Sequence, residues 1–118
     1  MNRYRRKVDS NHRTIENCFR SLGVSVAHVS SDTTAGFPDL VCGYLGRTRL
    51  VEVKPDTQLA KHQPSAAQQK WAQSWKGGSV ALVRNVEQVA ELVACWRVEY
   101  DAEFRAAKAY ASIAAVTP

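Results

Sequence analysis

Two acidic residues and one lysine lie in short apolar segments, where the pairing of two β-strands could bring them together. Asp39 is near the start of one segment (residues 38–44), and Glu52 and Lys54 belong to the next (residues 49–54). Both segments are rich in β-branched residues, so we predict a β-hairpin. Glu52 and Lys54 are two residues apart and therefore project from one face of the sheet. Asp39 projects from the same face if the loop has an even number of residues, as the common short hairpin loops do.

Two carboxylates and an ammonium group on one sheet face would be costly in an apolar core. A hard divalent cation removes that cost, because Mg²⁺ prefers one or two carboxylates together with water and phosphate oxygens. Such an ion lowers the pKa of its bound water and neutralises charge on a phosphate group. Lys54 would then lie beside the nucleophile or the phosphate. The alternative is an ordinary Glu–Lys pair on a surface hairpin.

The rest of the chain supplies elements that can hold such a hairpin in place. An apolar stripe at i, i+3, i+4 and i+7 predicts a first helix, which Gly23 is expected to end. Asn85 and Gln88 have the spacing of a capping box before the last helix of the core. The complete order is αβββαβα, with helices near 10–22, 65–75 and 86–97 and strands near 24–29, 38–44, 49–54 and 79–83. This order predicts an α/β fold, a small mixed sheet flanked by helices.

The composition narrows the class of protein. With 118 residues, one compact domain is expected. The formal net charge of +5 favours an anionic partner, and nucleic acid is the commonest one. No apolar run approaches the roughly 20 residues of a membrane span. The sequence contains neither a P-loop nor a GxGxxG motif, so it gives no sign of a nucleotide cofactor. The three cysteines (Cys18, Cys42 and Cys95) form no CxxC pair, which favours reduced thiols in a cytoplasm.

Three motifs follow one another in the order of a known nuclease family. They are GFPDLV at residues 36–41, LVEVK at residues 50–54 and SAAQQKW at residues 65–71. In the last motif, Ser65, Gln68 and Trp71 match the pattern S/T-x-x-Q-x-x-W. Together the motifs resemble the VRR-NUC branch (virus-type replication-repair nucleases) of the PD-(D/E)XK nuclease superfamily. The resemblance implies a restriction-endonuclease-like core and hydrolysis of DNA phosphodiester bonds that depends on Mg²⁺ or Mn²⁺, in DNA repair or recombination.

The resemblance also implies a role for each residue of the hairpin. Asp39 and Glu52 would bind the metal ion, helped by the backbone carbonyl of Val53, and Lys54 would orient or activate the water. Members of the family often carry an acidic residue on the first helix, and Glu16 is the matching residue here. Glu16 is also one step from the apolar stripe of that helix, where it could reach a metal through water. The alternative is a solvated helix glutamate.

Gln68 is expected to lie near the same centre. It shares a helix face with Trp71 and Trp75 at the spacing i, i+3, i+7. If that face packs on the sheet, the amide of Gln68 comes close to Lys54 or to a phosphate, in a catalytic role. The alternative is a capping or exposed glutamine. We expect the two tryptophans to pack in the core rather than to stack with bases.

Residues with basic or hydroxyl groups provide candidate contacts to DNA. Residues 1–8 form a basic tail, for which a merely solubilising role is the alternative. Ser31 lies in a polar loop suited to phosphate contacts, with a flexible connector as the alternative. The complete set of candidate DNA-binding residues is Arg3, Arg5, Arg6, Lys7, Ser31 and Lys61.

The organisation predicted from these motifs is a tail (residues 1–8), a nuclease domain (9–97) and a helical extension (98–118). The extension either forms a dimer contact or covers the protomer's own core. The resemblance implies a homodimer that cleaves branched DNA such as a four-way (Holliday) junction, in the cytoplasm of a bacterial or phage-infected cell. Two alternatives stay open: a non-catalytic DNA-binding or inhibitory module, and a nuclease of the same chemistry acting on flap or linear DNA.

Overall fold

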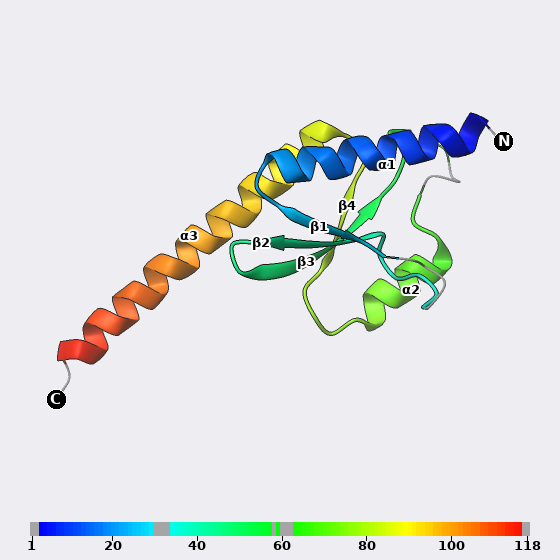
Figure 1. Ribbon diagram of the computed structural model, residues 1–118. Coiled ribbons are helices and arrows are strands. Elements are labelled where there is room, and N and C mark those ends of the chain that lie inside the picture. Colours follow the sequence, from blue (N-terminus) through cyan, green and yellow to red (C-terminus); the bar gives the residue numbers. More distant parts are fainter. Residues whose placement is uncertain (1–2, 30–33, 58, 60–62, 117–118) are drawn as a thin grey trace.

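A computed structural model describes residues 3–29, 34–57, 59 and 63–116 of the chain. Figure 1 shows the elements in the predicted order αβββαβα. They are α1 (Arg3–Ser21), β1 (Ser25–His28), β2 (Leu40–Tyr44), β3 (Arg47–Val53), α2 (Ala66–Ser74), β4 (Val80–Val83) and α3 (Val86–Val116). In the described ranges, no helix combines the length and the apolarity that crossing a membrane requires.

The four strands form one mixed sheet in the order β1-β2-β3-β4. The first three strands pair antiparallel, and β4 pairs parallel to β3 after the crossover through α2. Tyr44 pairs with Arg47, so the loop between β2 and β3 has two residues. Both loop residues, Leu45 and Gly46, have positive φ (49° and 78°), as a type I′ turn requires. The expected even loop is therefore confirmed, with β3 beginning two residues earlier than the sequence pattern suggested.

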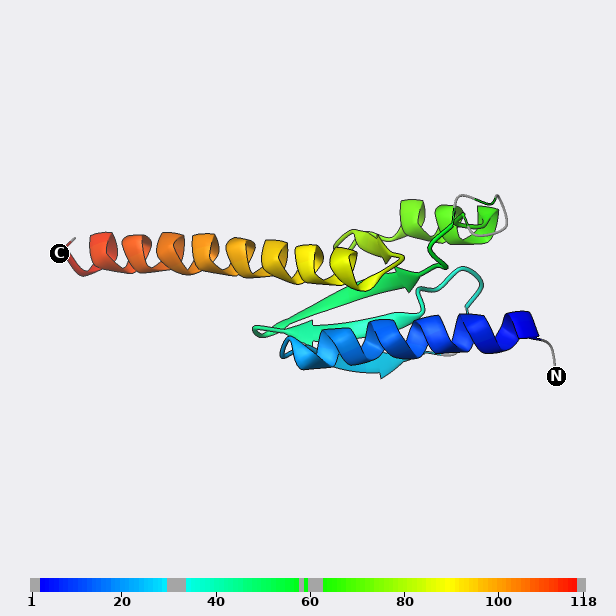
Figure 2. The same ribbon diagram turned by 90° about the horizontal axis from the view of Figure 1, so that it is seen from above.

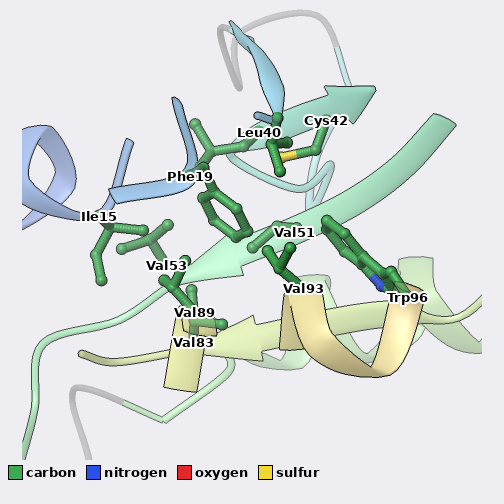
Figure 3. Packing of buried hydrophobic residues seen from close by; sticks show 11 residues of the cluster. Ile15, Phe19, Leu40, Cys42, Val51, Val53, Val83, Val89, Val93 and Trp96 are labelled. Carbon is green, nitrogen blue, oxygen red and sulfur yellow. The ribbon is translucent and has the colours of Figure 1, made fainter. Parts of the chain in front are cut away.

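Helices cover both faces of the sheet, as the two views in Figures 1 and 2 show. On one face, α1 and the first part of α3 pack on inward-pointing residues of the strands. Phe19 of α1 stacks on Trp96 of α3 with ring centroids 5.9 Å apart. Figure 3 shows this core, which consists of Ile15, Phe19, Val24, Leu40, Cys42, Val51, Val53, Val83, Val89, Val93 and Trp96. Because side chains alternate along a strand, the residues between these positions face α2.

Helix α1 is longer than the predicted helix over 10–22. It begins at Arg3, so the segment predicted as a basic tail has helical backbone from its third residue. No Gly or Pro interrupts residues 3–21, and arginine and lysine are good helix formers, which explains the extension. The predicted stop is confirmed at Gly23, where φ is 85° and the N–H donates to the carbonyl of Arg20.

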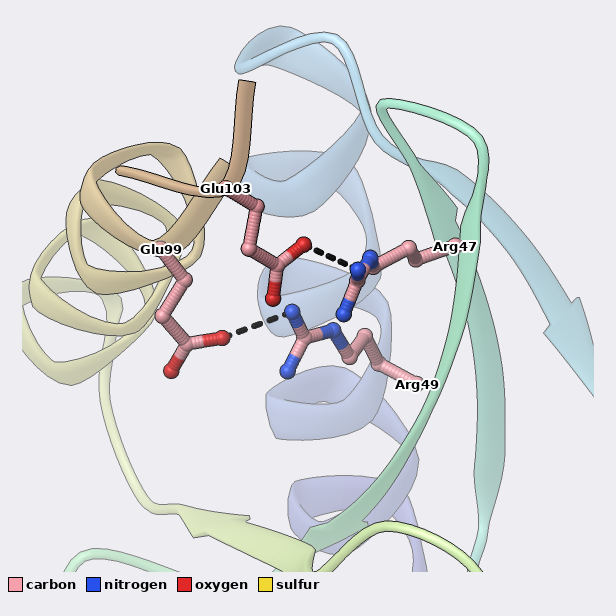
Figure 4. A network of polar contacts seen from close by, with 4 residues as sticks. All are labelled: Arg47, Arg49, Glu99 and Glu103. Carbon is pink, nitrogen blue, oxygen red and sulfur yellow. Dashed lines mark hydrogen bonds and ion pairs between the residues drawn. The ribbon is translucent and has the colours of Figure 1, made fainter. Parts of the chain in front are cut away.

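Helix α3 is a single helix of 31 residues, so the nuclease domain and the predicted extension share it. Two ion pairs join it to the end of the β2–β3 hairpin: Arg49 with Glu99 at 2.7 Å, and Arg47 with Glu103 (Figure 4). Beyond Glu103 the helix projects away from the sheet (Figures 1 and 2), and Tyr110 is 73% exposed. The projecting part therefore does not cover the protomer's own core, which removes one of the two expectations for it.

Candidate active site

Asp39 and Glu52 face each other at one end of the hairpin. They lie one step beyond the last β2–β3 pair, in the same register and on the same face of the sheet. The side chain of Asp39 accepts a hydrogen bond of 2.9 Å from the backbone N–H of Val53. Its backbone carbonyl accepts another, of 3.0 Å, from the N–H of Val29. The Asp39 carboxylate thus continues the hydrogen bonding of the sheet, which fixes its position.

Glu52 is the one charged side chain that is buried in the part of the chain described by the structure, with 5% of its surface exposed. Burial, followed by the hydrogen bond and the negative charge of Asp39, raises the pKa of Glu52 to about 9, although the charge of Lys54 acts in the opposite direction. Without a cation, Glu52 is therefore protonated at neutral pH and bonded to Asp39. A buried acid beside a second carboxylate is the arrangement that a divalent ion would resolve by replacing the proton.

Lys54 is held at the same end of the sheet by backbone contacts on both sides. Its N–H donates to the carbonyl of Val83 at 3.1 Å, and its carbonyl accepts from the side-chain amide of Asn11 at 3.3 Å. Its ammonium group is close enough to lower the pKa of Glu52. The predicted convergence of Asp39, Glu52 and Lys54 on one sheet face is thus what the structure shows, and Asn11 is a contact that the sequence did not indicate.

Gln68 makes the capping contacts that were the alternative to a catalytic role. Its side-chain oxygen accepts from the N–H of Ser65 at 2.8 Å, and its own N–H donates to the Ser65 hydroxyl at 3.1 Å. These two bonds form a capping box that begins α2. The same side chain lines a cavity together with Glu52. The cap therefore holds Gln68 at the cavity that Glu52 also lines.

The two tryptophans of α2 do not form the expected core contact. Trp71 is half-buried against Phe37, with ring centroids 5.0 Å apart, and Trp75 is 46% exposed. None of the residues of α2 is fully buried. The expectation of a core position is therefore wrong for Trp75, which lies at the surface beside Thr48, Arg49 and Leu50 of β3.

Glu16 lies with the core face of the sheet rather than with the carboxylate pair. It is half-buried, forms an ion pair of 3.7 Å with Arg20, and helps burial to raise the pKa of Cys42 to about 11. Cys42 belongs to the face covered by α1 and α3. Among the described residues, no three His, Cys, Asp or Glu side chains gather closely enough to hold a metal ion. The structure thus brings together Asp39 and Glu52 without Glu16.

The donors that are present fit Mg²⁺ or Mn²⁺ better than Zn²⁺. Two oxygen ligands from neighbouring carboxylates leave most of the coordination sphere to water and phosphate, as Mg²⁺ prefers. Structural zinc sites use four nitrogen or sulfur ligands, and neither kind accompanies the pair among the described residues. The N–H of Val53 is bonded to Asp39, and its carbonyl remains the third candidate ligand.

Arg84 is a residue of this region that the sequence did not indicate. Its guanidinium group donates to the carbonyls of Pro55 and Thr57 at 3.0 and 3.3 Å and to the side chain of Gln63 at 3.2 Å. These contacts fix both ends of the connection that follows Lys54. They join residues more than 20 positions apart, so no local pattern could reveal them.

Several predicted DNA contacts cannot be placed. Ser31 and Lys61 lie outside the described residues, and of the segment from Arg3 to Lys7 only the helical backbone is described. Their contacts with DNA stay predictions from the sequence.

Gly36 docks the loop before Asp39 onto α2, and replacing it by alanine should be costly. Its φ is 81°, and an added Cβ would overlap the carbonyl oxygen of Ala67 in the first turn of α2. We expect Gly36→Ala to lower the free energy of unfolding by about 2–4 kcal/mol. Gly46→Ala is the matched control, because Gly46 has a similar φ of 78° but open space around the new methyl group. Urea unfolding of both variants measures this, and equal losses would show that the approach to α2 is unimportant.

The raised pKa of Glu52 should make the metal-free chain less stable as pH rises. The protonated acid stabilises the folded state, so its contribution is complete below the ordinary pKa of 4.5 and disappears as pH rises toward about 9. One proton gives a slope of at most about 1.4 kcal/mol per pH unit. Urea midpoints measured between pH 5 and 9 in EDTA should fall for the wild type relative to Glu52→Gln. Parallel curves for the two proteins would mean that the pKa of Glu52 is not raised.

Comparison with known proteins adds a structural relative. No model of a known protein family matches the sequence, and a search of curated proteins finds no match. A solved structure described as a VRR_NUC domain is similar, with a TM-score of 0.61 and 26% sequence identity. The similarity covers 75% of this chain and 95% of the other. The chain therefore has the fold of a VRR-NUC domain, which is a nuclease-type fold.

Proposed function

We propose that this chain is a metal-dependent endonuclease that hydrolyses phosphodiester bonds in DNA. The observation that carries the proposal is the buried Glu52 carboxyl, paired with Asp39 and near the ammonium group of Lys54, on a fold of nuclease type. Perturbed acids in such clusters are typical of functional sites.

The residues of the chain divide the work of hydrolysis between them. Asp39 and Glu52, with the carbonyl of Val53, would hold Mg²⁺ or Mn²⁺. When bound, the ion supplies a water of lowered pKa and neutralises charge on the phosphate. Lys54 orients the attacking water or stabilises the added negative charge. The amide nitrogen of Gln68, whose oxygen is engaged in the cap, can donate to a phosphate oxygen.

The DNA bound is proposed to be branched, with a four-way junction as the preferred form. The net charge of +5 supports binding to a polyanion. The segment from Arg3 to Lys7, together with Ser31 and Lys61, is proposed to contact phosphates. A role in DNA repair or recombination, in a reducing cytoplasm of a bacterial or phage-infected cell, belongs to the same proposal.

The projecting part of α3 is proposed to join two copies of the chain. It carries the exposed side chains of Phe104, Tyr110 and Ile113. The exposed apolar residues of the same part would be covered in such a pair. Two identical sites related by two-fold symmetry suit a four-way junction.

Removing residues 104–118 should therefore convert a dimer to a monomer. The shortened chain keeps both ion pairs to the hairpin and every core residue, so its fold should persist. Sedimentation equilibrium at micromolar concentrations should give twice the chain mass for the full chain and the single mass for the shortened one. A full chain that sediments as a monomer, or a shortened chain that stays dimeric, would exclude this interface.

A cleavage assay tests the proposed function and separates its alternatives. A labelled four-way junction, a flap and a linear duplex of equal length are incubated with the full chain in Mg²⁺ and in EDTA. The proposal predicts that DNA is nicked in Mg²⁺ but not in EDTA, and that the junction is nicked faster than the flap or the duplex. Binding without nicking in either condition would indicate a non-catalytic module, and faster cleavage of the flap or the duplex would leave the chemistry but change the substrate.

A further inference from the structure

A cavity lies beside Glu52, between α2 and the sheet. Its volume is about 180 Å³, and its walls come from the loop before Asp39, from α2 and from β3 and β4. Most of the lining is apolar, with Trp71, Ala72, Val80 and Leu82 among the wall residues. The carboxylate pair needs no such space, because the ligands of a metal ion and of a phosphate are polar. The cavity therefore suits a different part of a ligand, one that is flat or apolar.

Two amide side chains give this apolar cavity one donor and one acceptor. The oxygen of Gln68 is used in the capping box, and the amide nitrogen of Gln69 donates to the carbonyl of Pro64 at 2.9 Å. The amide nitrogen of Gln68 and the oxygen of Gln69 have no hydrogen-bond partner among the described residues. A donor and an acceptor on two residues that line the cavity match the kinds of group that the edge of a nucleobase presents.

Aromatic rings continue from the cavity across the surface of α2. The rings of Trp71 and Trp75 are stacked, with centroids 4.9 Å apart and an angle of 19° between their planes. Phe37 packs against Trp71 with the rings at 65° to each other. Stacking on such rings stabilises single-stranded nucleic acid with little dependence on sequence. The exposure of Trp75, which a core role does not explain, has a use if bases reach this side of the sheet.

The size of the cavity agrees with one base. A cavity of about 150 Å³ in another protein admits a benzene ring, so 180 Å³ suits one nucleobase ring system. We propose that this cavity receives an unpaired nucleobase of the DNA, next to the phosphate held at Asp39 and Glu52. The proposal rests on the proposed function and specifies its substrate: DNA with an unpaired nucleotide beside the point of cleavage, such as an opened junction or a bulge.

Filling the cavity tests this directly. Ala72 lines the cavity but lies on the exposed side of α2, so Ala72→Phe adds a ring to the cavity without disturbing the core. Gln73→Phe makes a similar change at an exposed neighbour that does not line the cavity. The probe is a bulged oligonucleotide duplex with 2-aminopurine as the unpaired base, in EDTA to prevent cleavage. When the wild type or Gln73→Phe is added, stacking of the base in the cavity should quench the fluorescence of the 2-aminopurine. The concentration of Ala72→Phe needed for the same quenching should be at least tenfold higher.

Fluorescence anisotropy of the same DNA distinguishes loss of the cavity from loss of DNA binding. For Ala72→Phe we expect the affinity for a fully paired duplex to change by less than threefold. Trp71→Leu, which removes one wall instead of filling the space, should also reduce quenching and provides a second test if Ala72→Phe is unfolded by circular dichroism. Binding by the wild type without quenching, or equal quenching by all variants, would overturn the cavity proposal and leave the nuclease proposal intact. If the DNA is quenched in this way but is not cleaved in Mg²⁺, the cavity proposal would stand and the nuclease proposal would be overturned.

Discussion

Glu52→Gln should lower the rate of DNA cleavage by at least about a thousandfold, because it removes one of two charged ligands for the metal ion. Glutamine has the shape of the protonated acid and can keep the contact with Asp39 that the metal-free protein shows. The variant should therefore fold and bind DNA with an affinity close to that of the wild type. Single-turnover cleavage of the junction, with DNA affinity measured separately in EDTA, gives both quantities.

Glu16→Gln is the matched control for this change. It converts another carboxylate of the same chain, one that is half-buried, to an amide on the face of the sheet away from the pair. We expect cleavage within about threefold of the wild type, since the loss of a partly exposed ion pair has a small effect. If Glu16→Gln and Glu52→Gln were equally inactive, Glu16 would reach the metal after all. A fully active Glu52→Gln would remove Glu52 from the site.

Lys54→Ala should lower the cleavage rate by a factor of about 10²–10³ with little loss of DNA affinity. The ammonium group acts on the attacking water or on charge that develops during the reaction, so its effect appears mainly in the rate. Its backbone contacts to Val83 and Asn11 do not involve the side chain and should persist. Rates at saturating enzyme and dissociation constants in EDTA separate the two effects.

Lys76→Ala provides the comparison for charge alone. Lys76 is exposed in the connection between α2 and β4, so its loss changes the net charge equally without touching the carboxylate pair. We expect a small decrease in affinity and an unchanged rate at saturation. If Lys54→Ala lowered the DNA affinity and the cleavage rate in the same proportion, the role of Lys54 would be to anchor a phosphate group.

The local patterns were sufficient to predict the parts of the site that depend on one hairpin. The alternation of side chains and the two-residue loop together determine that Asp39 and Glu52 share a face, and both could be inferred from neighbouring residues. The capping box at Ser65 and Gln68 was likewise an available alternative, because its spacing is local.

The parts that could not be predicted depend on how distant elements pack. Arg84 and Asn11 contact the segment around Lys54 across 29 and 43 positions of the sequence, so their roles follow from the assembled fold. The exposure of Trp75 depends on how closely the end of α2 packs on the sheet, which the helix pattern does not record. The start of α1 at Arg3 shows that a basic segment without Gly or Pro can extend a helix although its charges suggested a tail.

Binding of Mn²⁺ by the full chain, followed by the electron paramagnetic resonance signal of the free ion at pH 8, tests the central arrangement most directly. The wild type should remove Mn²⁺ from solution at a site that Glu52→Gln lacks, and the affinity should rise with pH because the ion displaces the proton of Glu52. Binding that is equal in the two proteins, or a wild type that binds no Mn²⁺ even with DNA present, would contradict a metal site built from Asp39 and Glu52.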